Sequence, residues 1–208
     1  MSKKLILFSN SSDNIVKLRK NLLSYLAVEK FDITICIPEI ENKEIINLKN
    51  KYDFNLLILK YHRSSLNIIS NFYYIYKTYK ILIKNNYDLI LTFTIKPNIL
   101  VSISNFFVKK KIINIITGLG SSFFTNIFIK SLIIFLYKIS LARSNAIIFQ
   151  NFDDRDYFIN KKIVSIDKSF VILGSGVDTK HYLYKYKKFN KKNIKFLYAG
   201  RLIKDKGV

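Results

Sequence analysis

Short apolar segments recur along this sequence, and nearly every one is followed by a stretch with helical periodicity. In chain order they are KLILFS (4–9), FDITICIP (31–38), FNLLILKY (54–61), YDLILTFT (87–94), KIINIIT (111–117), NAIIFQN (145–151) and SFVILG (169–174). Strands that are apolar at almost every position are buried on both faces, as in parallel sheets covered by helices. With right-handed crossovers, this pattern predicts an α/β fold, a doubly wound parallel sheet of at least six strands.

The segments between these strands predict helices. They cover 14–28, 39–51, 68–83, a stretch that Pro97 opens, 123–142 and 153–159. Ser11 and Ser12 offer oxygens that can cap the first helix, and proline suits a first helical turn. Segment 123–142 is the most hydrophobic, but Lys130 and Lys138 interrupt it. Because a membrane span needs about 18 apolar residues, we expect a buried amphipathic helix there.

The composition of the chain changes after Gly176. Residues 178–193 are polar, basic and rich in tyrosine, whereas IKFLYAG (194–200) has the pattern of a new strand. We therefore expect residues 1–177 to form one sheet domain, 178–193 to be a linker, and 194–208 to begin a second domain. Linkers of this kind join α/β domains that face each other across a cleft.

The chain is strongly basic, with 35 Lys plus Arg against 14 Asp plus Glu and a formal net charge of +21. Such a charge favours an anionic partner: a nucleic acid, a membrane surface or a phosphate-bearing substrate. The single cysteine, Cys36, lies in a predicted strand and reads as a buried, inert thiol. One cysteine and two histidines argue against zinc ribbons and histidine-rich sites, so we expect no metal site.

Two glycine-containing turns follow predicted strands. TGLGSSF (117–123) has Gly118 and Gly120, but Phe123 stands where a dinucleotide-binding turn would have its third glycine. The turn can still bring backbone N–H groups close to an anion, or it can be purely structural. GSGVD (174–178) is interpreted as a hinge between domains.

Cationic side chains follow two other predicted strands. Lys96 comes directly after a strand and before a helix, at the carboxyl edge where parallel sheets bind their ligands. Near the end of the sequence, Gly200 follows a predicted strand, and Arg201 and Lys206 flank the next loop. A strand, a glycine, cations and the start of a helix together are typical of a phosphate site.

Six segments carry a resemblance to a known family. In order, they are SNSSDNIVKLRKNLL, TFTIKPNI, NIITGLGSSF, FQNFDDRDYF, ILGSGVD and AGRLIKDKGV. The chain resembles the family 4 glycosyltransferases of the GT-B fold, particularly bacterial enzymes of surface-polysaccharide assembly. The resemblance implies a Rossmann-like N-terminal domain that receives the acceptor and a C-terminal domain that holds a nucleotide-sugar.

The resemblance also assigns roles to residues. Arg201 and Lys206 match the diphosphate-binding pair of the family, and Gly200 lets the backbone approach the donor. The acceptor side is expected to include Asn14, Arg19, Lys96, Gly118 and Gly120. The rest of the donor domain, including its E-x7-E segment, would follow Val208, so we expect an incomplete chain without activity of its own.

The implied reaction is retaining transfer of a hexose or N-acetylhexosamine from a UDP-linked sugar, without a metal or other cofactor. The implied acceptor is a polyprenyl-diphosphate-linked sugar, and the implied location is cytoplasmic, peripheral at the inner membrane face. No nucleic-acid partner is expected.

Two other function classes stay open at this point. A basic nucleic-acid-binding module would use the charge with exposed aromatic rings, although no helix-turn-helix, zinc or RNP signature is present. A dinucleotide-binding oxidoreductase domain would share the alternating pattern, although the three-glycine turn is missing.

Overall fold

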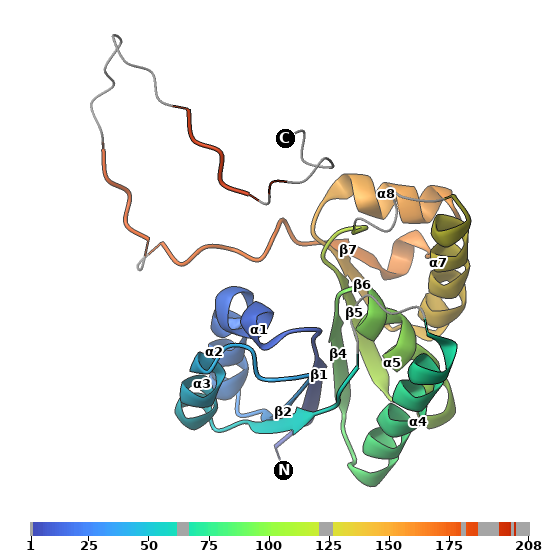
Figure 1. The fold of residues 1–208 in the computed structure, drawn as a ribbon, viewed down its shortest axis with the longest axis horizontal. Coiled ribbons are helices and arrows are strands. Elements are labelled where there is room, and N and C mark those ends of the chain that lie inside the picture. Colours follow the sequence, from blue (N-terminus) through green and yellow to red (C-terminus); the bar gives the residue numbers. More distant parts are fainter. Residues whose placement is uncertain are drawn as a thin grey trace.

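The computed structural model describes residues 2–61, 67–120, 127–179, 182–186, 196–200 and 202. Its strands form one parallel sheet in the order β3-β2-β1-β4-β5-β6-β7 (Figure 1). They are β1 (Lys4–Phe8), β2 (Asp32–Ile37), β3 (Asn55–Ile58), β4 (Leu89–Phe93), β5 (Lys111–Ile116), β6 (Ala146–Phe149) and β7 (Ser169–Val171). The predicted parallel sheet of at least six strands is confirmed.

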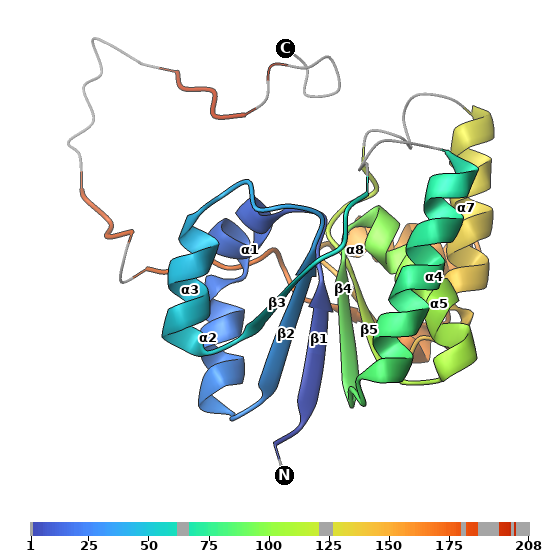
Figure 2. The same ribbon diagram turned by 60° about the horizontal axis from the view of Figure 1, so that its bottom comes forward.

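Helices cover both faces of the sheet, as the doubly wound prediction requires (Figure 2). One face carries α1 (Ser12–Leu18), α2 (Lys20–Val28) and α3 (Glu44–Tyr52). The other carries α4 (Ile68–Lys84), α5 (Ile95–Val108), α7 (Ile127–Ser140) and α8 (Phe152–Asn160). The chain changes face once, between β3 and α4, and this crossing puts the switch in strand order between β1 and β4.

Each face has its own hydrophobic core because successive strand side chains point to opposite sides. In β1, Leu5 and Leu7 pack toward α1–α3, whereas Ile6 and Phe8 pack toward α4, α5 and α7. All four side chains are fully buried. Near-continuous apolar strands are therefore explained by two covered faces.

The first predicted helix, 14–28, is interrupted at Arg19 in the structure. Arg19 has φ −123° and ψ 2°, outside the helical region, and separates α1 from α2. Ser11 caps α1: its Oγ accepts hydrogen bonds from the amides of Asp13 (3.1 Å) and Asn14 (3.4 Å). Helical periodicity continues across the break, so the pattern alone did not reveal it.

The helix predicted over 39–51 begins later, at Glu44. The amides of Glu41 and Asn42 instead donate to the Ser12 Oγ, at 2.8 and 3.0 Å. These bonds tie the loop after β2 to the start of α1, and they hold the backbone out of the helix. Of the helix predicted over 123–142, the described part runs to Ser140 and continues as a 3₁₀ turn, Leu141–Arg143.

The strand predicted over 194–199 is not formed in its described part. Residues 196–199 belong to no strand and are exposed, since a strand needs neighbours to pair its backbone groups. The domain limits at 177 and 193 stay predictions. The described residues from 172 to 179 and from 182 to 186 are exposed and lie in no helix or strand.

Two expectations about single features can be compared with the structure. Cys36 is buried in β2, and burial raises the pKa of its thiol to about 12, which confirms the reading of an inert core thiol. Within the described ranges, no helix has both the length and the apolar character needed to cross a bilayer.

A buried hydrogen-bond network fixes α5 to the sheet. Asn114 in β5 donates from Nδ2 to the hydroxyls of Thr92 (2.7 Å) and Ser102 (2.9 Å). Its Oδ1 accepts a hydrogen bond from the Ser144 hydroxyl at 2.6 Å. Asn98 in α5 accepts from the Thr92 hydroxyl at 2.6 Å and donates to the carbonyl of Ile115 at 2.9 Å. These polar side chains are almost inaccessible to solvent.

We expect Asn114→Ala to lower the free energy of unfolding by about 3 kcal/mol, because it leaves buried hydroxyls without partners. Urea unfolding measures the change. The control is Asn86→Ala, whose exposed side chain accepts a bond from Lys110 and should cost less than about 0.5 kcal/mol. Equal losses for the two variants would contradict the structural weight given to the network.

The predicted linker can be tested by limited trypsin digestion. Lys185 lies in an exposed segment without secondary structure, so we expect cleavage there before cleavage at lysines inside α4 or α7, since helical backbone fits proteases poorly. A fragment ending near Lys185 should accumulate and be identified by mass spectrometry. Simultaneous cutting in the helices would argue against a separate sheet domain.

Candidate functional site

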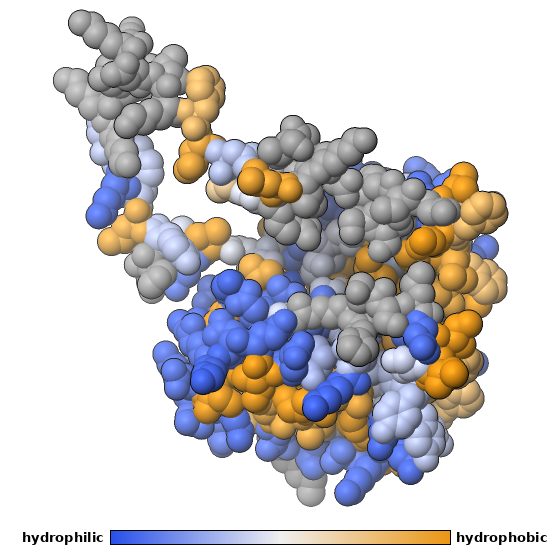
Figure 3. Space-filling model, viewed as in Figure 1, coloured by the Kyte–Doolittle hydropathy of each residue, from blue (hydrophilic) through white to orange (hydrophobic). Residues whose placement is uncertain are grey.

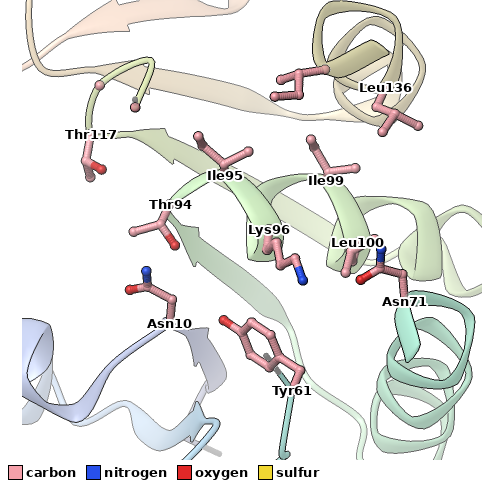
Figure 4. A pocket seen from close by; sticks show the side chains of 13 residues that line it. Asn10, Tyr61, Asn71, Thr94, Ile95, Lys96, Ile99, Leu100, Thr117 and Leu136 are labelled. Carbon is pink, nitrogen blue, oxygen red and sulfur yellow. The ribbon is translucent and has the colours of Figure 1, made fainter. Parts of the chain in front are cut away.

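A cavity of ≈ 390 Å³ opens at the carboxyl edge of the sheet, on the α4–α5–α7 side (Figure 4). It is lined by Asn10, Tyr61, Asn71, Thr94, Ile95, Lys96, Ile99, Leu100, Thr117, Gly118, Gly120, Ile133 and Leu136. Asn10 follows β1 and Thr94 follows β4, so the cavity lies where strand order reverses. Open α/β sheets bind ligands at this switch point because the loops there diverge.

Polar side chains gather along one side of the cavity. Asn10, Tyr61 and Thr94 come from the segments after β1, β3 and β4, and Thr117 follows β5. Figure 4 shows the Tyr61 hydroxyl directed toward the side of the cavity that holds Asn10 and Thr94. Hydroxyl and amide groups placed this way can hydrogen-bond a polyol such as a sugar.

The opposite wall is apolar. Ile95, Ile99 and Leu100 project from α5, and Ile133 and Leu136 project from α7. Apolar walls exclude water and strengthen the polar contacts beside them. The cavity therefore suits a ligand with one polar side and one apolar side.

Thr94 has a strained backbone at the mouth of this cavity. Its φ of 71° and ψ of 164° are unusual for a residue with a branched Cβ. Its Oγ1 is buried, yet it makes no hydrogen bond within the described residues. Strain and an unsatisfied buried hydroxyl in one residue are typical of a functional site, because a ligand can supply the missing partner.

Helix α5 begins at the same place. Ile95 and Lys96 are its first two residues, and their amides lack acceptors within the helix, as in any first turn. No side chain caps this end of α5, since the Thr94 hydroxyl does not bond to it. The start of α5 therefore presents free N–H groups and a partial positive charge to an anion.

Lys96 adds a full positive charge. Its Nζ lies 5.7 Å from the centroid of the Tyr61 ring, and partial burial lowers its pKa below the ordinary lysine value. Burial has this effect because it disfavours the charged form, and an anion bound nearby would reverse it. The expected position of Lys96, at the carboxyl edge beside a helix start, is confirmed.

The glycine turn after β5 closes the cavity on one side. Gly118 and Gly120 have φ values of 135° and 73°, which L side chains rarely adopt. A Cβ on Gly120 would lie 2.8 Å from the Ile95 Cδ1, so glycine also permits the close approach to α5. Both predicted residues line the cavity; whether they contact an acceptor stays a prediction.

Asn14 does not line the cavity but orients a residue that does. Its Nδ2 donates a 2.8 Å hydrogen bond to the Oδ1 of Asn10, four residues earlier. The Ser11 hydroxyl, which caps the same helix, donates to Glu41 at 2.6 Å. The first loop is thus held in place from both sides, and Asn14 acts on the cavity through Asn10.

Arg19 lies away from the cavity, although it was expected on the acceptor side. It is only 8% exposed, and its guanidinium lies over the Phe93 ring, 4.3 Å from the centroid. Its Nη1 donates to the Ser175 Oγ at 2.9 Å, and Gln150 donates to the same oxygen at 3.1 Å. Burial lowers the pKa of Arg19 to about 10, and the described residues include no carboxylate paired with it.

The donor-side predictions rest on the last segment. Gly200 is exposed and belongs to no helix or strand, while Arg201 and Lys206 lie outside the described residues. The expected diphosphate site therefore stays a prediction.

Several cavity residues were not anticipated from the sequence. Asn10, Tyr61, Asn71, Thr94 and Thr117 line the cavity but were not singled out. Four of these directly follow strands or lie within three residues of a strand end, and that common position is the signal that could have identified them. Asn71 lies in α4, which reaches the cavity only through the crossing between β3 and α4.

A family model described as "Glycosyl transferase 4-like" matches residues 4–151, more than half of the chain. The chain belongs to this glycosyl transferase 4-like family. No sequence among the curated proteins searched matches it. The family match confirms the resemblance read from the sequence, and it covers every residue of the cavity.

Solved structures similar to this glycosyl transferase 4-like chain share its fold. Anabaena HepE, in complex with UDP and glucose, has a TM-score of 0.62 and 12% identity, over 86% of this chain and 46% of that one. Acinetobacter baumannii MurG has a TM-score of 0.57 and 7% identity, over 86% and 47%. UDP-N-acetylglucosamine 2-epimerase from Rickettsia bellii has a TM-score of 0.60 and 15% identity, over 84% and 46%. The chain spans about half the length of these proteins.

The lowered pKa of Lys96 predicts its chemical reactivity. Since the neutral amine is the nucleophile, Lys96 should become reactive toward acetic anhydride at a lower pH than an ordinary lysine, whose pKa is about 10.4. Competitive labelling with peptide mass spectrometry across a pH series measures the midpoint. A midpoint at or above the ordinary value would mean that Lys96 is not desolvated in solution.

Proposed function

We propose that this chain is the acceptor-binding half of a retaining glycosyltransferase. The enzyme would move a hexose or N-acetylhexosamine from a UDP-linked sugar to a polyprenyl-diphosphate-linked sugar during surface-polysaccharide assembly. Membership of the glycosyl transferase 4-like family carries the proposal. The two-sided cavity at the carboxyl edge supports it.

The cavity matches the chemistry of such an acceptor. Asn10, Tyr61 and Thr94 offer hydrogen-bonding groups for sugar hydroxyls, and the apolar wall suits a sugar ring face or the first prenyl unit. Lys96 and the start of α5 would receive the diphosphate, because an ammonium and free helix N–H groups both favour an anion. The buried Thr94 hydroxyl would gain its missing hydrogen bond.

The proposed reaction exchanges one bond at the anomeric carbon for another. The bond from C1 to the donor diphosphate oxygen breaks, a bond to the acceptor hydroxyl oxygen forms, and that hydroxyl gives up its proton. UDP leaves with the electron pair of the broken bond. Arg201, Lys206 and Gly200 would bind the diphosphate and neutralise its developing charge, which is the main electrostatic demand of this step. No metal or cofactor is part of this proposal.

The donor half needs more than these three residues. Two cations exposed to water and salt bind a diphosphate weakly. We therefore expect residues 1–208 alone to bind acceptor but to show no turnover. The bound UDP and glucose named for HepE are consistent with donor binding in proteins of this fold.

The alternatives from the sequence have no comparable support. Neither a nucleic-acid-binding module nor an oxidoreductase domain accounts for the family match over residues 4–151. A cytoplasmic location at the inner membrane face follows from the proposed acceptor, whose lipid would reside in that membrane.

Titration with a short-chain, water-soluble polyprenyl-diphosphate sugar tests the proposal. Lys96→Ala should weaken binding by about 1–3 kcal/mol, the range for a charge-assisted hydrogen bond. Lys161→Ala, in an exposed residue after α8, is the control and should change binding little. Binding should also weaken as pH rises through the lowered pKa of Lys96, because the ammonium is lost.

Lys96→Arg should keep binding constant over that pH range, since a guanidinium stays charged. If both alanine variants lose affinity equally, and salt removes both effects, the attraction is diffuse and the proposed acceptor site is wrong.

A further inference from the structure

We propose that α4 and α7 form a docking surface for an anionic lipid bilayer at the carboxyl edge of the sheet. The docking surface consists of Ile68, Ile69, Phe72, Tyr73 and Tyr76 of α4 and Ile127, Phe128, Leu132 and Phe135 of α7. The inference deepens the proposed function, because the lipid of the acceptor would lie in the same bilayer.

Large apolar side chains on this surface point into solvent. Ile69 is 80% exposed and Phe128 is 81% exposed, and the other members of the set are exposed as well. In α7, only Ile133, Tyr137 and Ser140 are buried, although almost the whole helix is apolar. Soluble proteins seldom expose so many apolar side chains together without a partner.

The docking surface lies on both sides of the candidate site. Helices α4 and α7 flank α5, and both begin at the carboxyl edge (Figure 2). Figure 3 shows apolar side chains over α7 on the right of the molecule. The cavity opens between these helices, with Asn71 from α4 and Leu136 from α7 on its walls. A lipid-linked molecule held in a bilayer against this edge could therefore reach the cavity without leaving the membrane.

The charge on this face selects the partner. Helices α4, α5 and α7 contain no acidic residue but carry lysines. These are Lys77, Lys80, Lys84, Lys96, Lys130 and Lys138. The opposite face differs, since Asp13, Glu41 and Glu44 lie among α1, α3 and their loops. A surface with both apolar side chains and lysines, but no carboxylate, matches lipids with anionic headgroups.

The lysines also lie beside aromatic rings. The Nζ of Lys77 is 5.2 Å from the centroid of the Tyr73 ring, and that of Lys80 is 4.7 Å from Tyr76. Tyrosine and lysine both place an apolar body in a membrane interface and a polar tip in water. The pairs thus fit the headgroup region of a bilayer.

Other partners fit less well. A second copy of the chain would bring six lysines against six others without a carboxylate to pair them, and interfaces between copies are depleted of charge at their centres. A nucleic acid would bind the lysines, but it would leave the exposed isoleucines in water. The bilayer accounts for both features at once.

Vesicle co-sedimentation of the 208-residue chain tests the inference. The vesicles are phosphatidylcholine with about one third phosphatidylglycerol, and phosphatidylcholine alone serves as the neutral comparison. The chain should bind the anionic vesicles at least about tenfold more tightly than the neutral ones. Ile69→Ser with Phe128→Ser should reduce binding to the anionic vesicles by about tenfold or more, because both side chains lose apolar burial.

The control pair is Tyr25→Ser with Val28→Ser on α2, where the original side chains are 62% and 74% exposed on the opposite face. It should leave vesicle binding within about twofold of the original chain. Equal losses for the two pairs, or no loss for either, would overturn the docking surface. So would sedimentation showing a dimer that Ile69→Ser with Phe128→Ser disrupts, if vesicles retain neither protein.

The short-chain acceptor separates this inference from the proposed function. The docking variant should bind that water-soluble acceptor as the original chain does, since none of its changes lies in the cavity. Lost vesicle binding with normal acceptor binding supports the docking surface. Normal vesicle binding with no acceptor binding to any form supports the surface and contradicts the proposed function.

Discussion

The buried hydrogen bonds of Asn114 hold together the parts of the molecule on which the site depends. They connect β4, β5, α5 and the turn after α7 in a region closed to water. Asn98 extends the same network to the first turns of α5. Because the cavity uses the start of α5 and one wall of that helix, its shape follows from this polar contact inside an apolar core. Apolar packing alone would leave α5 free to slide along the sheet.

Prediction from sequence succeeded where a local pattern determines structure. Each β-strand from 4 to 171 is an apolar run, so burial on two faces could be read without tertiary information. The break at Arg19 could not, since it depends on Phe93 and Ser175, which are distant in the sequence. Lys96 was found because it follows a strand directly. Tyr61 was missed because its role requires the crossing from β3 to α4, a feature of topology.

The two faces of the sheet have different tasks. The α1–α3 face is tied by hydrogen bonds between the first loop and the loop after β2, and it carries charges of both signs. The α4–α7 face carries only positive charge and leaves apolar side chains in solvent. A single change of face by the chain, between β3 and α4, separates a stabilised half from a half available for contact.

The bond between Arg19 and Ser175 has a consequence for how related sequences should vary. The two residues are 156 positions apart, yet one hydroxyl receives hydrogen bonds from both Arg19 and Gln150 in the turn where the chain leaves the sheet. Gly174 and Gly176 on either side adopt φ values of 68° and 76°, so the turn cannot readily adjust to a new partner. Positions 19, 150 and 175 should therefore covary among homologues. A sequence that replaces the arginine should also change the residue in the middle of its Gly-x-Gly turn.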